Sequence, residues 1–446
     1  MQRLFGTDGV RGLANRDLSP ELALRLGRAA ALVSTGKKPG KIVVGRDTRL
    51  SGDLIENAMV AGILSAGVDV LRIGIMPTPA AAYLTRAMEA DAGIVISASH
   101  NPIEDNGIKF FDRYGFKLAC DVEQKIEKLV SDDRWDLSEA IGVNVGRVYY
   151  VGSEARKIYI DHVLGTIQGD LSGLKIILDC AYGSVWEIGP TIFRKAGAEV
   201  IPYHNEPLGS KINVGCGSTN PDFLISSVLK TPGAFGLSFD GDGDRVIAVD
   251  EQGNYLDGDV IMAIAADRMH TDRQLRGDKV VVTVMTNYGF DLAMEEKGIE
   301  VVKTDVGDRH VLQKMREDGA NLGGEQSGHI VFLDHNTTGD GIITGLQLAH
   351  IVKKSGGRLE PLGGIMRRLP QVLVNVNVND KQKLEASDMV KQMVEAAEED
   401  LTGHGRVLIR PSGTEPLVRV MVEAEDEKDA RSIADELAET VRKELG

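Results

Sequence analysis

The chain has 446 residues, with 51 Lys and Arg against 66 Asp and Glu, so its formal net charge is -15. Nucleic acids and anionic membranes also carry negative charge, and this balance argues against both as partners. Apolar residues make up 42% and charged residues 26% of the chain, as expected for folded globular domains. Its length corresponds to about three domains of ordinary size.

The cysteines and the N-terminal residues indicate the compartment. Cys120, Cys180 and Cys216 are far apart and form no CxxC pair, so the sequence predicts neither a disulfide framework nor a zinc site. The opening, MQRLFGTDGVRG, lacks the apolar segment of a secretory signal, and no segment approaches the ~18 apolar residues of a membrane span. We therefore expect a cytoplasmic protein.

One pattern occurs three times along the chain: an apolar strand, a helix that ends at Gly, and a second apolar strand. We expect the first strands at 41–47, 175–181 and 279–285. Gly suits the helix ends because it adopts the left-handed conformation at little cost. The pattern is typical of βαβ crossovers and predicts three similar α/β domains, with mixed sheets in which most strands are parallel.

The last part of the chain follows a different pattern. After the Gly- and Pro-rich segment 358–370 come an alternating strand, VLVNVNVN, a charged helix around 381–401, a second strand region, and a helix at 427–445. This order predicts a smaller α+β domain. We place the four domains at 1–150, 151–252, 253–366 and 367–446.

The first of four polar loops is ISASHNP, which follows an apolar strand at 93–97. It places Ser99 at a strand end, where α/β proteins carry reactive groups. His100 and Lys109 are the nearby candidates for a base that would activate the serine hydroxyl. Ser, Asn and Pro are also common turn residues, so a capped turn without chemistry is the alternative.

The second loop, DGDGDR, brings Asp240, Asp242 and Asp244 together between glycines. Carboxylates this close repel one another, and a hard metal ion is the simplest account of their coexistence. An EF-hand is one alternative, with Glu251 as its twelfth residue, but Arg245 replaces the required Gly and the flanks alternate like strands. A phosphatase with an aspartate nucleophile is another.

The third and fourth loops suit a phosphorylated sugar. In GGEQSGHIVF, Glu325 and Ser327 offer polar groups for sugar hydroxyls, although a hairpin turn explains them equally well. The fourth loop, LIRPSGTEPLVRV, combines guanidinium groups, hydroxyls and backbone amides, which suit a phosphate dianion, and a structural turn is the alternative. Its candidate phosphate ligands are Arg410, Ser412, Gly413, Thr414 and Arg419.

The chain resembles the α-D-phosphohexomutases over essentially its whole length. Five motifs carry the resemblance, in this order: FGTDGVRG, ISASHNP, DGDGDR, GEQSG and RPSGTEP. The resemblance implies four domains around one central cleft, each lending one loop. It also implies that Ser99 carries a phosphoryl group. The metal ligands for Mg²⁺ would then be Ser99, Asp240, Asp242 and Asp244.

The family implies an isomerase that moves phosphate within a hexose through a bisphosphate intermediate. FGTDGVRG, Gln326 and VGDRHV (306–311) favour its glucosamine branch, with glucosamine 6-phosphate, glucosamine 1-phosphate and glucosamine 1,6-bisphosphate as the sugars and cell-wall amino-sugar synthesis as the use. A glucose or mannose phosphate mutase is the alternative. Because Asp308 stands where relatives of the phosphomannomutase type tend to carry His, no role is transferred to His310 or His329.

The resemblance and sequence proximity also imply roles for the groups around Ser99. Lys109 would be the general acid and base, helped by His100, and Arg11 would hold the transferring phosphate. A homodimer is expected, as is a kinase or bisphosphate donor that first loads Ser99. Outside enzymes, a noncatalytic calcium or sugar-phosphate binding protein is the alternative.

Overall fold

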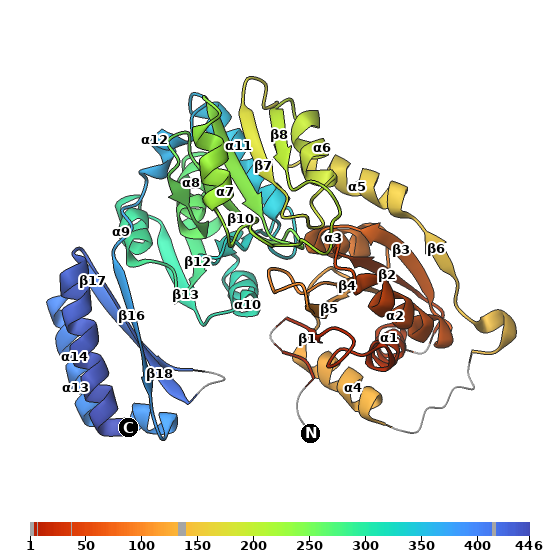
Figure 1. Ribbon diagram of the computed structural model, residues 1–446, viewed down its shortest axis with the longest axis horizontal. Helices are drawn as coiled ribbons and strands as arrows, with labels where there is room; N and C mark the ends of the chain where they lie inside the picture. The colour runs from red at the N-terminus through yellow and green to blue at the C-terminus, as the bar shows by residue number, and fades with distance from the viewer. Residues whose placement is uncertain (1–3, 7, 37, 133–139, 413–415) are drawn as a thin grey trace. The chain divides into compact units, whose positions relative to one another are not determined.

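The larger of two compact units in the computed structural model comprises Met1–Met285 and Glu300–Gly363, and the smaller comprises Thr286–Ile299 and Gly364–Gly446. The four domain ranges drawn from the sequence remain a prediction. Figure 1 follows the chain by colour from the N-terminus to the C-terminus. The residues described are 4–6, 8–36, 38–132, 140–412 and 416–446.

The first sheet of the larger unit is mixed. Its strands are β1 (Val10–Leu13), β2 (Lys41–Arg46), β3 (Asp69–Ile75), β4 (Ala92–Ile96), β5 (Asp105–Asp112) and β6 (Val148–Tyr150). They lie in the order β1-β5-β4-β2-β3-β6, with β2 parallel to β3 and β4, and β5 antiparallel to β4. The helices are α1 (Pro20–Thr35), α2 (Gly52–Ser65), α3 (Thr78–Ala87) and α4 (Cys120–Ser131), with a 3₁₀ turn at Gly142–Asn144.

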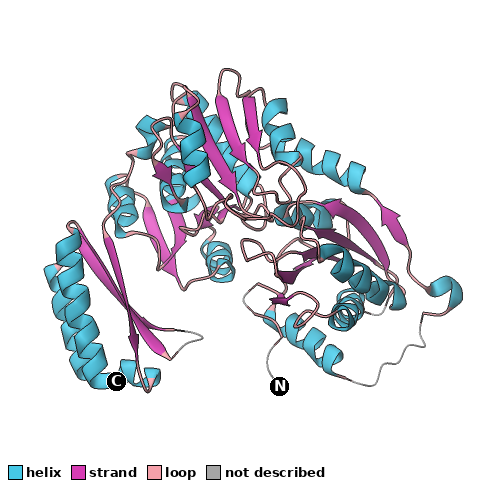
Figure 2. Cartoon of the chain, in the orientation of Figure 1, coloured by secondary structure: helices cyan, strands magenta, loops and turns pink. Residues whose placement is uncertain are grey.

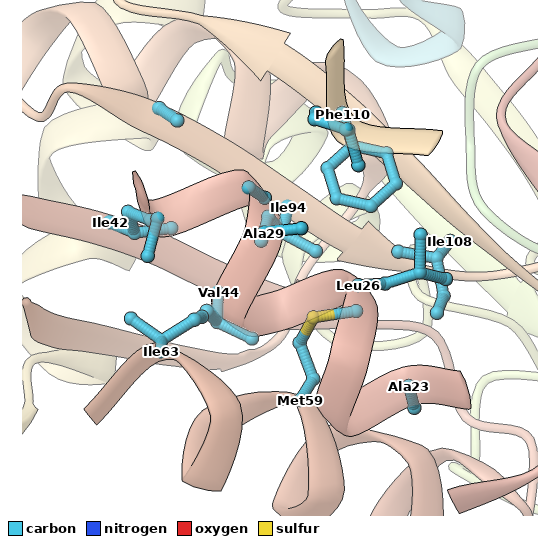
Figure 3. Packing of buried hydrophobic residues seen from close by; sticks show 14 of the residues in the cluster. Ala23, Leu26, Ala29, Ile42, Val44, Met59, Ile63, Ile94, Ile108 and Phe110 are labelled. Atoms are coloured by element: carbon cyan, nitrogen blue, oxygen red, sulfur yellow. The ribbon is translucent and has the colours of Figure 1, made fainter. Parts of the chain in front are cut away.

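Helices α1 and α2 bury their apolar faces against this sheet. The side chain of Ser19 caps the N-terminus of α1 by accepting the N–H of Leu22, and Gly36 ends the helix in the left-handed conformation. Between these ends, Leu26 packs with Met59 of α2 in the same core cluster as the sheet residues (Figure 3). The sheet contributes Ile42, Val44, Ile94, Ile108 and Phe110.

The second sheet has the order β11-β10-β9-β7-β8. Its strands are β7 (Lys175–Asp179), β8 (Glu199–Tyr203), β9 (Ala234–Phe239), β10 (Val246–Val249) and β11 (Tyr255–Leu256). β7 is parallel to β8 and β9, and β10 is antiparallel to β9. The accompanying helices are α5 (Gly152–Leu164), α6 (Ile188–Lys195) and α7 (Asp222–Leu229).

The third sheet has the order β13-β12-β14-β15. Its strands are β12 (Lys279–Thr283), β13 (Glu300–Thr304), β14 (Leu322–Gly324) and β15 (Ile330–Phe332). β12 is parallel to β13 and β14, whereas β15 is antiparallel to β14. The helices in this part are α8 (Gly258–Thr271), α10 (Asp308–Asp318), α11 (Gly341–Lys354) and α12 (Glu360–Gly363), and a 3₁₀ turn covers Arg276–Asp278.

These three sheets share one arrangement of strands. In each, the first strand of the repeat (β2, β7 or β12) is central, the second and third strands flank it in parallel, and the fourth runs antiparallel to the third. The repeated pattern in the sequence therefore corresponds to a repeated topology. The predicted fold class, three similar α/β domains with mixed sheets, is confirmed.

The smaller unit contains an antiparallel sheet of order β16-β18-β17, formed by β16 (Gln371–Asn377), β17 (Gly405–Pro411) and β18 (Leu417–Ala424). Helices α13 (Asp388–Asp400) and α14 (Glu427–Leu445) pack against it and each other (Figure 2). A 3₁₀ turn at Lys381–Ala386 precedes α13, and α9 (Tyr288–Glu296) belongs to the same unit. This is the predicted α+β part.

Buried Glu423 on β18 joins the two segments of the smaller unit. Its carboxylate accepts the backbone N–H of Tyr288 at 2.8 Å and the side-chain amide of Asn287 at 3.2 Å, and it pairs with Arg406 at 2.7 Å. A buried carboxylate is tolerated because these donors replace the water it has lost.

Two other expectations can be compared with the structure. Cys120, Cys180 and Cys216 are free thiols. None of the helices in the described part of the chain has the length and apolar character that crossing a bilayer requires.

The core of the first sheet provides a stability prediction. Replacing Leu26, which is 0% exposed, with Ala should destabilise the protein by about 3 kcal/mol, because a cavity replaces the buried side chain. Leu24→Ala on the same helix is the control: Leu24 is 38% exposed, so its loss should change stability by less than about 0.5 kcal/mol. Thermal unfolding of both variants would measure this, and equal shifts would contradict the packing described.

Candidate active site

Three of the four polar loops lie at equivalent places in the repeated topology. The Ser99 loop joins β4 to β5, DGDGDR joins β9 to β10, and GEQSG joins β14 to β15. Each loop thus connects the third parallel strand of its sheet to the antiparallel fourth. Reactive groups commonly gather where such strands end.

Ser99 lies against the aspartate loop. It is buried, and its hydroxyl donates to Oδ2 of Asp240 at 2.5 Å, while Nδ1 of His100 lies 3.4 Å from Oγ of Ser99. The backbone of Ser99 has φ of 53°, a left-handed conformation that costs a residue with a Cβ about 1–2 kcal/mol. The surrounding contacts must therefore hold this conformation, as is common at functional sites.

The three aspartates form one buried cluster after β9. One carboxylate oxygen from each of Asp240, Asp242 and Asp244 lies within 4.8 Å of those of the others. Gly241 has to be glycine because a Cβ there would lie 2.7 Å from the carbonyl oxygen of Ser99, and Gly243 has a left-handed φ of 71°. The glycines therefore allow both the tight turn and the close approach to the serine loop.

This cluster fits a divalent cation. Burial, together with Asp244 and Asp242, raises the pKa of Asp240 well above its usual value. One buried oxygen of Asp242 and one of Asp244 accept no hydrogen bond among the described groups. Buried carboxylate oxygens without donors are costly, and an oxygen-ligated cation such as Mg²⁺ would compensate them. The donor set therefore suits the predicted Mg²⁺.

Lys109 on β5 supplies a fixed positive charge to the same cluster. Its buried Nζ lies 2.8 Å from Asp242, 3.1 Å from Asp244 and 3.1 Å from Asp8. Burial alone would lower the pKa of Lys109, but these three carboxylates raise it well above its usual value. Lys109 is accordingly held as an ammonium, which can donate a proton but accepts none until it has lost one.

His100 has the opposite character. Burial, with repulsion from Arg245 and Arg11, lowers its pKa to about 4, so the imidazole is neutral near pH 7. Nη1 of Arg245 lies 3.1 Å from Nδ1 of His100, and since arginine can only donate, the proton of His100 belongs on Nε2. Arg11 reaches the serine loop through Asn101, whose side-chain oxygen accepts from it at 3.1 Å.

The GEQSG loop contacts the aspartate loop. The backbone N–H of Val246 donates to the carbonyl of Gly328 at 3.1 Å. Glu325 is half-buried and accepts the N–H of Gly307 at 3.2 Å, and Ser327 is exposed. The side-chain nitrogen of Gln326 is buried without an acceptor among the described groups. The loop thus combines a structural turn with polar groups still available to a ligand.

His329, left unassigned from the sequence, connects two loops. Its Nδ1 is 3.7 Å from Asp244 and its Nε2 is 3.5 Å from Asp308. Burial would lower its pKa, but Asp244 and Asp308 raise it. In its neutral form the proton lies on Nδ1, because the N–H of Gly339 donates to Nε2 at 3.1 Å. Asp308 also pairs with Lys117, which in turn pairs with Asp8.

The sequence did not single out several of these charged groups as functional. Only the fold brings three of them close to the aspartate cluster: Arg245, Asp8 and Lys117. A signal was present for two of them, because Asp8 and Arg245 lie inside the motifs FGTDGVRG and DGDGDR. Lys117 has no such signal.

The fourth loop belongs to the smaller unit. Arg410 on β17 lies directly opposite Arg419 on β18, and burial and then Arg419 lower the pKa of Arg410. The carbonyl of Ser412 accepts from Nζ of Lys381 at 2.6 Å. These groups form a positively charged strand end, as an anion site requires. Gly413 and Thr414 lie outside the described residues.

The EF-hand alternative is incompatible with this arrangement. Both carboxylate oxygens of Glu251 accept backbone N–H groups, from Leu359 at 2.8 Å and Glu360 at 2.9 Å. Strands β9 and β10 flank the aspartate loop, where an EF-hand requires helices.

Comparison with known families agrees with the fold and the loops. The chain matches the models of the phosphoglucomutase/phosphomannomutase family in chain order. The matches are α/β/α domain I over 2–136, α/β/α domain II over 157–253, α/β/α domain III over 257–371 and the C-terminal domain over 373–440. The chain belongs to this family.

Within the family, curated relatives of the chain are phosphoglucosamine mutases. That of Desulforamulus reducens is 54% identical over 442 residues, covering 99% of both chains, and that of Clostridium kluyveri is 52% identical over 450 residues, covering 100% of both. Such identity over the full length shows one common fold.

Solved structures show the same fold. A phosphoglucomutase/phosphomannomutase family protein from Burkholderia thailandensis matches with a TM-score of 0.82 at 25% identity, covering 99% of this chain and 98% of that one. An N-acetylphosphoglucosamine mutase from Aspergillus fumigatus, solved in complex with GlcNAc-6P and magnesium, matches with a TM-score of 0.70 at 20% identity, covering 99% and 96%.

The position of Lys109 predicts how it affects the metal. In the dephosphorylated protein, Lys109→Met should tighten Mn²⁺ binding by about tenfold, because a fixed ammonium beside two ligand carboxylates opposes a cation. Lys117→Met is the matched control, since Lys117 pairs with Asp8 and Asp308 instead, and it should alter the affinity far less. Calorimetric titration would measure both, and unchanged or weaker binding in Lys109→Met would refute this.

Proposed function

We propose that this protein is a phosphoglucosamine mutase that interconverts glucosamine 6-phosphate and glucosamine 1-phosphate. The observation that carries the proposal is the buried contact between Ser99 and Asp240, which joins a serine loop to a cation-binding aspartate cluster. The curated relatives at 52–54% identity over the whole chain support the choice of sugar. The product would supply amino-sugar precursors for cell-wall synthesis.

Ser99 would carry the phosphoryl group. A sugar hydroxyl oxygen forms a bond to phosphorus as the bond from phosphorus to Oγ of Ser99 breaks, which gives glucosamine 1,6-bisphosphate. After the sugar turns over, its original phosphoryl group returns to Ser99. Phosphoryl transfer depends mainly on positioning and on neutralising charge. Mg²⁺, held by Ser99, Asp240, Asp242 and Asp244, would supply part of that neutralisation.

The chain's own residues would manage the proton and the remaining charge. Lys109 is our candidate for the acid, because it is held as an ammonium, and the incoming hydroxyl would restore its proton. His100 is neutral and accepts from Arg245, so its part would be to keep that guanidinium in place. Arg11, which reaches the serine loop through Asn101, would hold the transferring phosphate.

The other two loops would recognise the substrate. Glu325 and Ser327 would bind sugar hydroxyls in the GEQSG loop. The phosphate that is not being transferred would bind at the fourth loop. The proposed ligands there are Arg410, Ser412, Gly413, Thr414 and Arg419.

Several further properties belong to the proposal. The three free cysteines fit a reducing compartment, and we place the protein in the cytoplasm. A kinase or a bisphosphate donor would first phosphorylate Ser99, and the protein would act as a homodimer.

Ser99→Ala tests the reaction directly. The purified wild type should carry one phosphoryl group on Ser99, detected by intact mass and peptide mapping. The variant should lose at least about 1,000-fold in turnover of glucosamine 6-phosphate with Mg²⁺, because the acceptor oxygen is gone. Ser226→Ala is the control: that hydroxyl donates to the carbonyl of Phe223 within α7, and its loss should leave turnover unchanged. Activity retained by Ser99→Ala would move the nucleophile elsewhere.

Sugar preference needs a separate comparison. At equal enzyme concentration, kcat/KM for glucosamine 6-phosphate should exceed the values for glucose and mannose 6-phosphates, because buried polar groups disfavour a substrate that leaves them unpaired. If glucose or mannose phosphate gave the higher kcat/KM, the phosphoglucomutase/phosphomannomutase alternative would hold instead, with the same serine chemistry.

A further inference from the structure

A fully buried arginine lies beneath the serine loop and uses every donor it has. Arg49, in the segment between β2 and α2, has no exposed side-chain surface. A guanidinium carries five N–H donors. In this structure all five have acceptors: Oδ2 of Asp47, and the backbone carbonyls of Ser99, Asn101, Pro102 and Asp105.

The four carbonyls belong to one short stretch of the chain, the loop that follows β4 and the first residue of β5. The distances are 3.0 Å to Ser99, 2.8 Å to Asn101 and 3.0 Å to Asp105. A planar guanidinium with fixed donor directions can only satisfy these carbonyls in one arrangement of the loop. Arg49 therefore specifies the path of the backbone on both sides of His100.

Asp47 extends the same support to the backbone nitrogen of Ser99. Its carboxylate accepts from the backbone N–H of Arg49 at 2.9 Å and from the hydroxyl of Ser97 at 2.5 Å. The Ser97 oxygen in turn accepts the N–H of Ser99 at 2.9 Å. Buried groups thus hold both the backbone N–H and the backbone carbonyl of Ser99.

Asn213, which lies between β8 and β9 of the second sheet, provides a second donor to the Ser99 carbonyl. Its side-chain amide donates to this oxygen at 2.9 Å. With Nη2 of Arg49, this carbonyl accepts two hydrogen bonds, which hold Ser99 at φ of 53°. In that conformation the Ser99 hydroxyl reaches Asp240.

We infer that Arg49 is a positioning residue for phosphoryl transfer, acting with Asn213 on the Ser99 carbonyl to aim the serine oxygen at the aspartate cluster. The inference rests on the proposed function, because it assigns the transferring group to Ser99. Arg49 does not touch the reacting atoms. It maintains the strained backbone that carries them, and a displacement of about 1 Å at such a site costs about 100-fold in rate.

The test measures single-turnover transfer from phosphorylated enzyme to glucosamine 6-phosphate, normalised to the phosphoserine present by intact mass. Arg49→Lys keeps the charge but replaces the five-donor fork with three donors, and it should slow transfer by about 100-fold with little change in the glucosamine 6-phosphate concentration that gives half the maximal rate. Arg72→Lys is the matched control. Arg72 lies in the same domain and pairs with buried Glu56 at 3.0 Å, so its replacement should leave transfer unchanged.

A second pair of variants serves if Arg49→Lys fails to fold. Asn213→Gly removes one donor to Ser99 while accepting the native φ of 60°, and it should slow transfer by about tenfold. Asn15→Gly, at φ of 62° on an exposed residue, is the control and should match wild type. If the variant that combines Arg49→Lys with Asn213→Gly folds, its loss in transfer rate should be smaller than the product of the two single losses, since both residues act on the carbonyl of Ser99.

The outcomes separate this inference from the proposed function. Folded, phosphorylated Arg49→Lys that transfers at the wild-type rate would overturn the inference alone, as would equal rates for Asn213→Gly and Asn15→Gly. Wild-type protein that acquires no phosphate on Ser99 even when incubated with glucosamine 1,6-bisphosphate would overturn the proposed function and the inference together. A stability loss with unchanged transfer per phosphorylated enzyme would reduce Arg49 to a purely structural role.

Discussion

The compensation of buried negative charge at the aspartate loop is the constraint on which the rest of the site depends. Three carboxylates share a small buried volume, where water cannot screen them. Lys109 neutralises part of this charge, and Asp8 ties that lysine to the opening motif of the chain. Two oxygens still lack donors among the described groups, which leaves a place for a cation. The same charge holds Lys109 protonated and thereby determines the chemistry it can perform.

The repeated topology explains why these groups meet. Each of the three sheets delivers one loop from the same connection, between its third strand and its antiparallel fourth. Contacts then tie the loops together: Ser99 to Asp240, and His329 to Asp244. A repeated unit that presents one loop in one position can serve three different tasks if only the loop residues differ. In this chain those residues are a serine, a set of carboxylates, and the polar groups of the GEQSG loop.

The support beneath Ser99 illustrates how strain is maintained. A left-handed serine persists only where its surroundings leave no alternative. Here the Arg49 guanidinium, Asp47 and Asn213 hold its backbone from two parts of the chain. The close approach of Gly241 adds a steric limit from the aspartate loop.

The amino-acid sequence alone is enough to identify the fold class, the family and the polar loops. Apolar strands, glycine helix ends and five motifs in order suffice for that, because these signals are local in the chain. It did not determine which side chains meet. Lys117, Asp308 and His329 lie far apart in the sequence, and only packing of the strands and helices brings them within ion-pairing distance.

The sequence also could not predict the charge states of the site, since the low pKa of His100 and the raised pKa of Lys109 arise from burial and from neighbours on other loops. Arg49 shows the difference most plainly: in the sequence it is one charged residue after a strand, and only the tertiary structure reveals that it is buried against three carbonyls of the serine loop and one at the start of β5.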